Sequence, residues 1–301
     1  ETSEFMVVEA DEYDRSFLHL HPQIAIITSL DSDHLDIYHS HDAIIQAFSN
    51  FAGNILPEGA LIVKKGIETA FTLPEKRHVY TYAVNEKADF YADNLKLVKG
   101  LYNFDFHYPA GIISSVTLGI PGLYNVENSV AAMAAVLLAG LTPDEISNGL
   151  TSFRGVKRRF DIRYNENGRI YIDDYAHHPE ELNACIRSAK AMFPESRITG
   201  IFQPHLFSRT RDFAEDFAKS LDQLDEILLL PIYPAREKPI EGVTSEMLLE
   251  KMISENKHLL KKEEIESYLE KNQPEVLITM GAGDIDTLVP VLESFFMKTK
   301  Q

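Results

Sequence analysis

The stretch Tyr171–Phe193, YIDDYAHHPEELNACIRSAKAMF, predicts a strand that ends in polar residues and leads directly into a helix. Residues 169–172 carry alternating isoleucines, and Pro179 with the acids behind it suits the first turn of a helix. Ligands of open α/β sheets bind just beyond the carboxyl ends of strands. The polar groups at that point are Asp173, Asp174, Tyr175, His177 and His178. A polar turn before a helix is the alternative, but so many polar groups together favour a functional site.

Composition limits the class of protein. The chain has 301 residues, 45% of them hydrophobic, which is enough for two domains with separate cores. Lys and Arg number 29 against 46 Asp and Glu, and the net charge of −17 excludes a general attraction for nucleic acid or anionic membranes. The single cysteine, Cys185, cannot form an internal disulfide and fits a reducing cytoplasm. No apolar run reaches transmembrane length, so we expect no membrane insertion.

The first half of the chain predicts a parallel sheet followed by an antiparallel meander. Strands are expected at 5–8, 23–29 and 59–64, and a helix at 40–51 separates the second from the third. Between His78 and Gly119 four short alternating segments predict the meander. The sheet and the meander would belong to one domain.

Two helices follow the meander. An alanine-rich helix is expected to run to about Ala139, and a shorter one at 143–150 would be capped by Thr142. Residue 1 is Glu1 and not Met, and the first predicted strand begins within four residues. We therefore expect a fragment that starts inside a domain.

The second half predicts another doubly wound sheet. A boundary is expected near Gly155, where a basic run separates two patterned regions, which gives domains at 1–153 and 154–301. Strands are expected at 160–166, 169–172, 197–202, 225–230 and 275–279, and helices at 179–192, 208–221, 244–253, 263–271 and 285–297. The expected fold class is α/β, with two doubly wound, mostly parallel sheets, the first of which carries an antiparallel meander.

An acidic rim is predicted where the first two strands end. Glu9 follows the first strand and His34 follows the second, with several aspartates beside them. A divalent cation would neutralise this rim, and the histidine suggests zinc or manganese before magnesium. A solvated acidic loop explains the same residues equally well.

Amide and guanidinium groups near the centre of the chain could contact a nucleotide. Asn125 and Asn128 would face one way at the start of the alanine-rich helix, where they could cap it or bind a base edge. Arg158 and Arg159 could hold a phosphate, although a solvated hinge is the usual explanation of such a run.

A third group of polar residues follows the strand at 197–202. His205, Arg209 and Arg211 come at the start of the next helix and suit a ligand that bears a carboxylate. The glycine turn at 281–286 begins like a dinucleotide fingerprint but has Asp286 at the third glycine position, so a nicotinamide site is not expected. The sequence G-x-x-x-x-G-K-[ST] is absent, so any triphosphate would need a phosphate loop supplied elsewhere.

Taken together, these motifs resemble the Mur ligase family, and within it the members that use L-alanine. The matching segments are EADE at 9–12, DHLD at 33–36, PGLYNVEN at 121–128, RRF at 158–160, DDYAHHP at 173–179, FQPH at 202–205, SRTRD at 208–212 and GAGDI at 281–285. The resemblance implies the later part of a central ATP-binding domain, without its phosphate loop, and a complete Rossmann-like C-terminal domain that binds the amino acid.

The resemblance also implies a reaction and its partners. ATP would phosphorylate the lactyl carboxylate of UDP-N-acetylmuramate, and the amine of L-alanine would attack the acyl phosphate, in peptidoglycan precursor synthesis. A monomer or a weak dimer is expected, and the fragment is expected to be inactive alone.

Roles for individual residues come from the same resemblance. Glu9 and His34 match magnesium ligands. Tyr124, Asn125 and Asn128 match adenine contacts, Asp174 a ribose contact and Arg159 a phosphate contact. His177, His205 and Arg209 match the alanine site, and His177, His205 and Arg159 are the candidate catalytic residues. Leu206 departs from the family, because some members have arginine there.

Other functions remain open from the sequence. The muropeptide ligases of cell-wall recycling attach a whole peptide to the same sugar nucleotide. A non-catalytic nucleotide-binding or assembly module would explain the missing phosphate loop. A metal hydrolase built on Asp33, His34 and Asp36 is the weakest alternative, since no second histidine ligand is evident.

Overall fold

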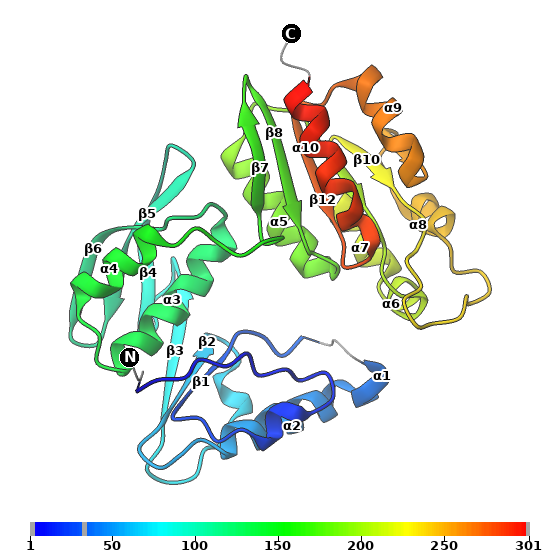
Figure 1. Ribbon diagram of the computed structural model, residues 1–301. Helices are drawn as coiled ribbons and strands as arrows, with labels where there is room; N and C mark the ends of the chain where they lie inside the picture. Colours follow the sequence, from blue (N-terminus) through cyan, green and yellow to red (C-terminus); the bar gives the residue numbers. More distant parts are fainter. Residues whose placement is uncertain (1–3, 32–34, 299–301) are drawn as a thin grey trace. The chain divides into compact units, whose positions relative to one another are not determined.

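The computed structural model describes residues 4–31 and 35–298. The chain divides into two compact units (Figure 1). The first unit contains Glu1–Gly119 and Asn125–Phe153, and the second contains Ile120–Tyr124 and Arg154–Gln301. Each unit has its own six-stranded sheet with helices, which confirms the predicted α/β class.

The sheet of the first unit has the strand order β1-β2-β3-β4-β5-β6. Its strands are β1 Ile24–Ile27, β2 Ala60–Lys64, β3 His78–Val84, β4 Phe90–Val98, β5 Leu101–Tyr108 and β6 Gly111–Thr117. The pairs from β1 to β4 are parallel, and β4-β5-β6 is the antiparallel part. The prediction that placed β3 in the meander is wrong, because β3 pairs in parallel with both of its neighbours.

Helix α2, His41–Gly53, forms as the apolar spacing predicts, and the Ser40 side chain caps it by accepting from the Ala43 N–H. Its buried residues pack with β1 and β2 in one core. Helix α4, Pro143–Ser152, begins with the predicted cap at Thr142. The other helical segments here are η1 Ser16–His19, α1 Leu35–Tyr38, η2 Glu68–Ala70 and α3 Leu123–Leu138, whose first two residues belong to the second unit.

The predicted strand at 5–8 is wrong. These four residues have no regular secondary structure, and the side chains of Met6 and Val7 are 88% and 98% exposed. An apolar run becomes a strand only when a neighbouring strand satisfies its backbone groups. Within the described residues, β1 pairs with β2 alone, so 5–8 lacks that neighbour.

The sheet of the second unit has the order β11-β10-β9-β12-β8-β7. Its strands are β7 Asp161–Glu166, β8 Arg169–Asp174, β9 Ile198–Phe202, β10 Glu226–Leu229, β11 Lys257–Leu259 and β12 Val276–Met280. All of its pairs are parallel except β7-β8, a hairpin whose turn residues Asn167 and Gly168 have positive φ. The prediction omitted β11, which is short and only half-buried.

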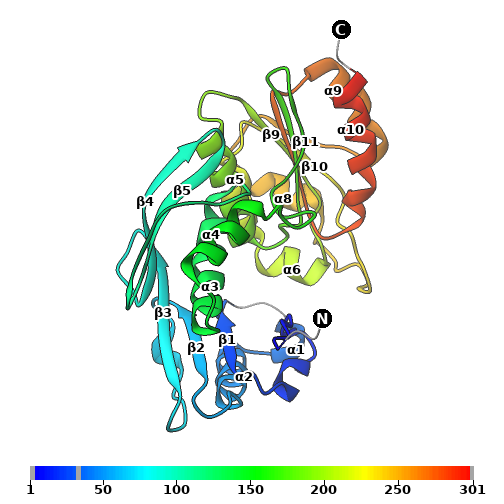
Figure 2. The same ribbon diagram turned by 60° about the vertical axis from the view of Figure 1, so that its left-hand side comes forward.

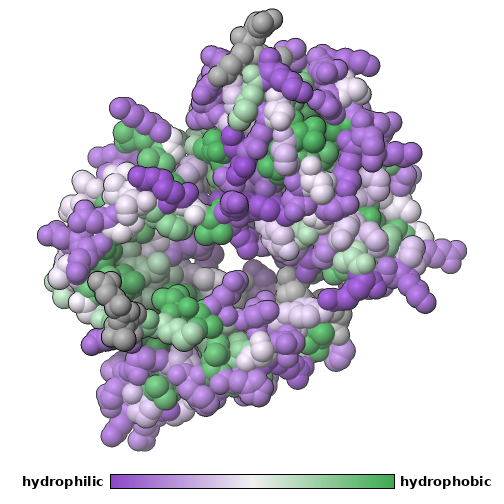
Figure 3. Space-filling view, in the orientation of Figure 1, coloured by the Kyte–Doolittle hydropathy of each residue, from purple (hydrophilic) through white to green (hydrophobic). Residues whose placement is uncertain are grey.

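Helices cover both faces of this second sheet. Helices α5 Pro179–Met192, α7 Ala214–Leu221 and α8 Ser245–Lys251 share one core with alternate strand residues. Helices α9 Lys262–Asn272 and α10 Val289–Lys298 share the other core and lie side by side (Figure 2). The side chains on the visible outer face of this unit are mostly hydrophilic (Figure 3).

Two predicted helices of the second unit are interrupted. The helix expected at 208–221 is divided into α6, Phe207–Asp212, and α7, because Phe213 adopts φ −114° and ψ 19°, outside the helical region. The helix expected at 285–297 begins as the 3₁₀ helix η3, Asp284–Leu288, before α10. Across residues 4–31 and 35–298, no helix is long and apolar enough to cross a membrane.

Candidate active site

Three neighbouring parallel strands of the second unit bring the predicted site residues to one edge of its sheet. Strand β12 lies between β8 and β9, with Met280 paired to Asp174 on one side and to Phe202 on the other. The segments that leave the carboxyl ends of these strands therefore begin side by side. In open α/β folds this edge is where ligands bind.

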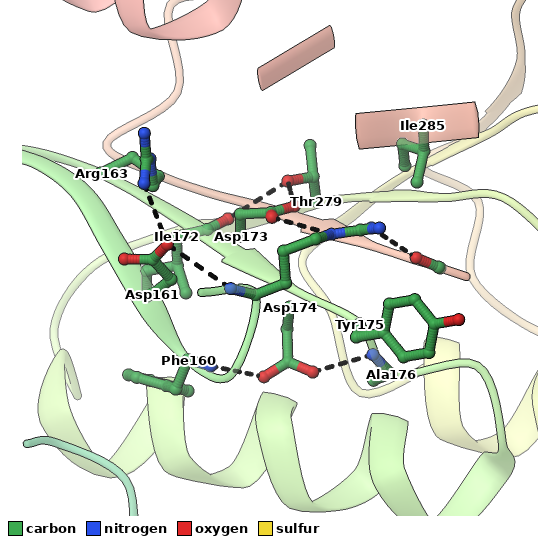
Figure 4. Close-up of polar contacts among 12 residues, drawn as sticks. Phe160, Asp161, Arg163, Ile172, Asp173, Asp174, Tyr175, Ala176, Thr279 and Ile285 are labelled. Atoms are coloured by element: carbon green, nitrogen blue, oxygen red, sulfur yellow. Dashed lines mark hydrogen bonds and ion pairs between the residues drawn. The ribbon is translucent and has the colours of Figure 1, made fainter. Parts of the chain in front are cut away.

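Asp173 is a buried carboxylate held by two partners. Its Oδ1 accepts from the Thr279 hydroxyl at 2.7 Å (Figure 4), and its Oδ2 accepts from Arg158 Nε at 3.1 Å. Arg158 Nη2 also donates to the carbonyl of Gly281 at 2.6 Å, so one guanidinium joins the ends of β8 and β12. Burial raises the pKa of Asp173, although both partners act in the opposite direction.

Asp174 is only 3% exposed, and both of its oxygens accept hydrogen bonds. Figure 4 shows the bonds from the backbone N–H groups of Phe160 and Ala176, at 2.7 and 2.8 Å. The Tyr124 hydroxyl donates to Oδ2 at 2.9 Å. Burial raises the pKa of Asp174 to about 6, because these three donors only partly replace the lost water. Because the side chain is 3% exposed, a ribose hydroxyl could reach this carboxylate only if the residues around it moved.

The predicted adenine contacts differ in exposure. Tyr124 contacts the Phe160 ring edge-on at 6.4 Å, and burial raises the pKa of its hydroxyl, so it stays a neutral donor. In the first unit, Asn125 is 8% exposed, whereas Asn128 is exposed on the same face of α3. Only Asn128 has a side chain that is open to a ligand without rearrangement.

The two arginines of the basic run have different environments. Arg158 is fixed by the strand ends, and its guanidinium also lies 5.0 Å from the centre of the Tyr175 ring. The Arg159 side chain is 48% exposed and reaches Glu181 Oε1 at 3.5 Å. The sequence could not distinguish the two arginines, because their partners, Asp173 and Glu181, are brought to them only by the fold.

His177 and His205 lie together although they follow different strands. Their ring centres are 6.2 Å apart and their planes are at 78°. His177 Nδ1 lies 3.0 Å from the Tyr175 carbonyl oxygen and 3.2 Å from Glu181 Oε2. Burial, followed by the nearby Arg209 charge, lowers the pKa of His205 to about 4, so this imidazole is neutral at pH 7.

Helix α6 carries Arg209 beside this histidine pair. Arg209 is 8% exposed, whereas Arg211 on the same helix is 54% exposed in its side chain and pairs with Asp212 at 2.7 Å. The start of α6 is held by Glu237, which accepts from the Ser208 N–H at 2.9 Å and from its hydroxyl. The sequence reasoning missed Glu237. Its position after the next parallel strand, β10, was the available signal.

Most of the chain is similar to proteins of known family. The family profile of the Mur ligase middle domain matches residues 1–136, and that of the Mur ligase glutamate ligase domain matches residues 158–283. The chain belongs to the Mur ligase family. Two UDP-N-acetylmuramate–L-alanine ligases, from Phocaeicola vulgatus and Parabacteroides distasonis, are each 48% identical to it over 96% and 99% of its length. The chain spans 63% and 64% of the length of these relatives.

A solved structure gives the same fold for this Mur ligase chain. The UDP-N-acetylmuramate-alanine ligase of Thermotoga maritima matches it with a TM-score of 0.77 and 23% identity. The match covers 97% of this chain and 63% of the other. At this identity the likeness shows the fold alone.

The predicted metal site of the Mur ligase chain lies largely outside the described structure. Glu9 is exposed and follows the irregular segment at 5–8, and His34 falls outside the described residues. Within 4–31 and 35–298, no group of three or more His, Cys, Asp or Glu side chains is arranged to hold a metal ion. The described donors do not by themselves fit a magnesium ion.

The glycine turn after β12 is filled by protein. A Cβ at Gly283 would lie 2.4 Å from Gln203 Oε1 and 2.7 Å from Tyr233 Cβ. The Gln203 side chain donates to Asp284 and accepts from the Ile285 N–H, at 2.8 and 2.9 Å. These glycines therefore allow two protein segments to approach closely.

Proposed function

We propose that this chain belongs to an ATP-dependent ligase that joins L-alanine to the carboxylate of UDP-N-acetylmuramate, a cytoplasmic step of peptidoglycan precursor synthesis. The observation that carries the proposal is the His177–His205 ring pair, with ring centres 6.2 Å apart, together with the buried Arg209 of α6, at the edge of the second sheet. The relatives named above support it, since both are L-alanine ligases. In this proposal residues 1–153 belong to the ATP-binding domain and residues 154–301 form the amino-acid-binding domain.

The reaction would need two steps, because a carboxylate is a poor electrophile. Transfer of the γ-phosphoryl group of ATP to the lactyl carboxylate gives an acyl phosphate and ADP. The amine of L-alanine then attacks the carbonyl carbon, and the tetrahedral intermediate releases phosphate as the amide forms. Phosphoryl transfer depends mainly on positioning and charge neutralisation.

In the second step the attacking amine must first lose a proton, since only the free amine is a nucleophile. His205 could accept it, because its imidazole is neutral at pH 7, although the lowered pKa makes it a weaker base than an ordinary histidine. The buried guanidinium of Arg209 would bind the carboxylate of L-alanine. His177, which faces His205, would line the same site.

In the first step we assign the nucleotide contacts by resemblance. Tyr124, Asn125 and Asn128 would hold adenine, Asp174 the ribose, and Arg159 the phosphates. The exposure of the Arg159 side chain supports its assignment, whereas the buried Asp174 would become accessible only if the residues around it moved. Magnesium held by Glu9 and His34 remains a prediction.

The test uses the natural protein that carries this chain. It is incubated with magnesium and with ATP, UDP-N-acetylmuramate and L-alanine, each also omitted in turn. Phosphate should be released only when all three are present, and mass spectrometry should detect the sugar nucleotide with one alanine added. Phosphate release that does not depend on L-alanine would contradict the proposal.

A further inference from the structure

The segment 231–237, PIYPARE, follows β10 and lies against the residues around His205. His205 and Tyr233 form an isolated parallel bridge. The Leu206 N–H donates to the carbonyl of Tyr233 at 3.0 Å, and the Tyr233 N–H donates to the carbonyl of Pro204 at 2.8 Å. The backbone on both sides of His205 is therefore hydrogen-bonded to the backbone of Tyr233.

The side chains make a second contact at the same place. The ring of Tyr233 is stacked on the ring of His205, with centres 5.8 Å apart and planes at 17°. Against Tyr233 lies the backbone of Gly283, where a Cβ would be only 2.7 Å from Tyr233 Cβ. Only glycine at position 283 leaves Tyr233 its present place.

The local backbone alone would not hold His205 in this orientation. Leu206 adopts φ 69° and ψ 138°, a combination that side-chain-bearing residues avoid. Such a conformation persists only where surrounding contacts impose it. Here the bond from the Leu206 N–H to Tyr233 is one such contact. The backbone of residue 233 thus holds the chain beside His205, and the stacked ring of Tyr233 is the part that contacts the imidazole itself.

We propose that Tyr233 is a positioning residue that fixes the orientation of the His205 imidazole, and that Gly283 provides the space in which Tyr233 sits. The importance of His205 rests on the proposed function, but the positioning of its ring does not. Tyr233 itself need not touch a substrate. It would act through His205, as a support that keeps the ring in one orientation.

Other groups also influence His205, and the test must separate them from Tyr233. Charged or titratable groups face it from the end of β8, from α6 and from the segment after β10. These groups are His177, Arg209, Arg236 and Glu237. Arg236 and Glu237 lie on the same segment as Tyr233, so a change at His205 reports the loss of the stacked ring only when Tyr233→Leu shows it and Tyr233→Phe does not.

The first experiment follows the histidine signals of this chain by NMR as pH is varied. Tyr233→Leu should move the His205 ring signals and raise the pKa of His205 toward its ordinary value, because the ring becomes exposed. Tyr233→Phe should leave both nearly unchanged. Tyr268→Leu is the matched control, since Tyr268 contacts the ring of His258 at 5.2 Å, and it should affect only that histidine. Unchanged His205 signals in folded Tyr233→Leu would overturn the proposal.

A second variant approaches the same contact from the other side. Gly283→Ala should displace Tyr233, together with the Gln203 amide that the added Cβ would meet at 2.4 Å, and change the His205 signals in the same direction, while His258 stays unchanged. Thermal melting of each variant shows whether it is folded. Should Tyr233→Leu fail to fold, Gly283→Ala and Tyr233→Phe decide the question, and a folded Gly283→Ala with unaltered His205 signals would refute the inference.

Kinetics of the natural protein give an independent reading. In Tyr233→Leu, kcat should fall by about 10- to 100-fold while KM for L-alanine changes little, since a reacting group misplaced by about an ångström costs that much. The acid limb of the pH profile of kcat should move to higher pH in Tyr233→Leu. In Tyr233→Phe, both kcat and this pH profile should be close to those of the wild type. If the parent protein does not use L-alanine, the proposed function fails, and the NMR result alone decides the role of Tyr233.

Discussion

Replacing Asp174 with asparagine should change how the stability of the chain depends on pH. The side chain is 3% exposed and lies at the end of β8, where three donors hold it. Burial raises its pKa from 3.8 to about 6. Asparagine has nearly the same shape but cannot ionise. The variant therefore lacks the titration of residue 174, while all other ionisable groups of the protein are unchanged.

The sign and size follow from linkage between proton binding and folding. Between pH 3.8 and about 6 the unfolded carboxyl ionises while the folded one keeps its proton, so the free energy of unfolding falls as pH rises. A shift of roughly two pKa units corresponds to about 3 kcal/mol. The free energy of unfolding of the wild type minus that of Asp174→Asn should therefore decrease by about 2.4 kcal/mol between pH 4 and pH 7.

The assay is urea unfolding followed by circular dichroism at pH 4, 5, 6 and 7 for both proteins. Subtracting the free energy of unfolding of the variant from that of the wild type removes the contributions of all other carboxyl groups. Asp216→Asn, at an exposed carboxylate of α7, is the matched control, and its difference from wild type should stay nearly constant with pH. A difference that is flat for Asp174→Asn, or that rises with pH, would refute the reasoning about this buried carboxyl.

Three further predictions use single substitutions with controls. Arg158→Ala should lower the free energy of unfolding by about 3 to 5 kcal/mol in urea titrations, because a buried carboxylate loses its ion pair, whereas the exposed Arg159→Ala should change it by less than about 1 kcal/mol. Arg209→Ala should raise KM for L-alanine about 10-fold or more in phosphate-release assays, and Arg211→Ala should not; an unchanged KM would remove Arg209 from the site. Thr142→Ala should cost about 1 kcal/mol on thermal melting, since it removes a helix cap, and equal melting curves would contradict that role.

Local patterns were sufficient to predict much of the fold. The apolar spacing of α2 and the cap at Thr142 depend on residues a few positions apart, and both formed as predicted. The direction of β3 and the absence of a strand at 5–8 depend on which distant segment pairs with them. Strand pairing is a long-range property, so the sequence pattern alone could not determine it.

The candidate site was predictable as a location but not in detail. Polar residues after a strand pointed to the edge where Asp173 and Asp174 lie. The pattern did not reveal that Asp174 is enclosed by three donors, or that Tyr233 stacks on His205. Both facts arise from contacts between segments far apart in the sequence.

The choice of amine acceptor tests the central claim most directly. With the natural protein, ATP, magnesium and UDP-N-acetylmuramate, phosphate release is measured for L-alanine, glycine, L-serine and the tripeptide L-Ala-γ-D-Glu-diamino acid, each offered separately. We predict that L-alanine gives the highest kcat/KM. Preference for the tripeptide would contradict that claim and assign the protein to muropeptide recycling, and no release with any acceptor would favour a non-catalytic nucleotide-binding role.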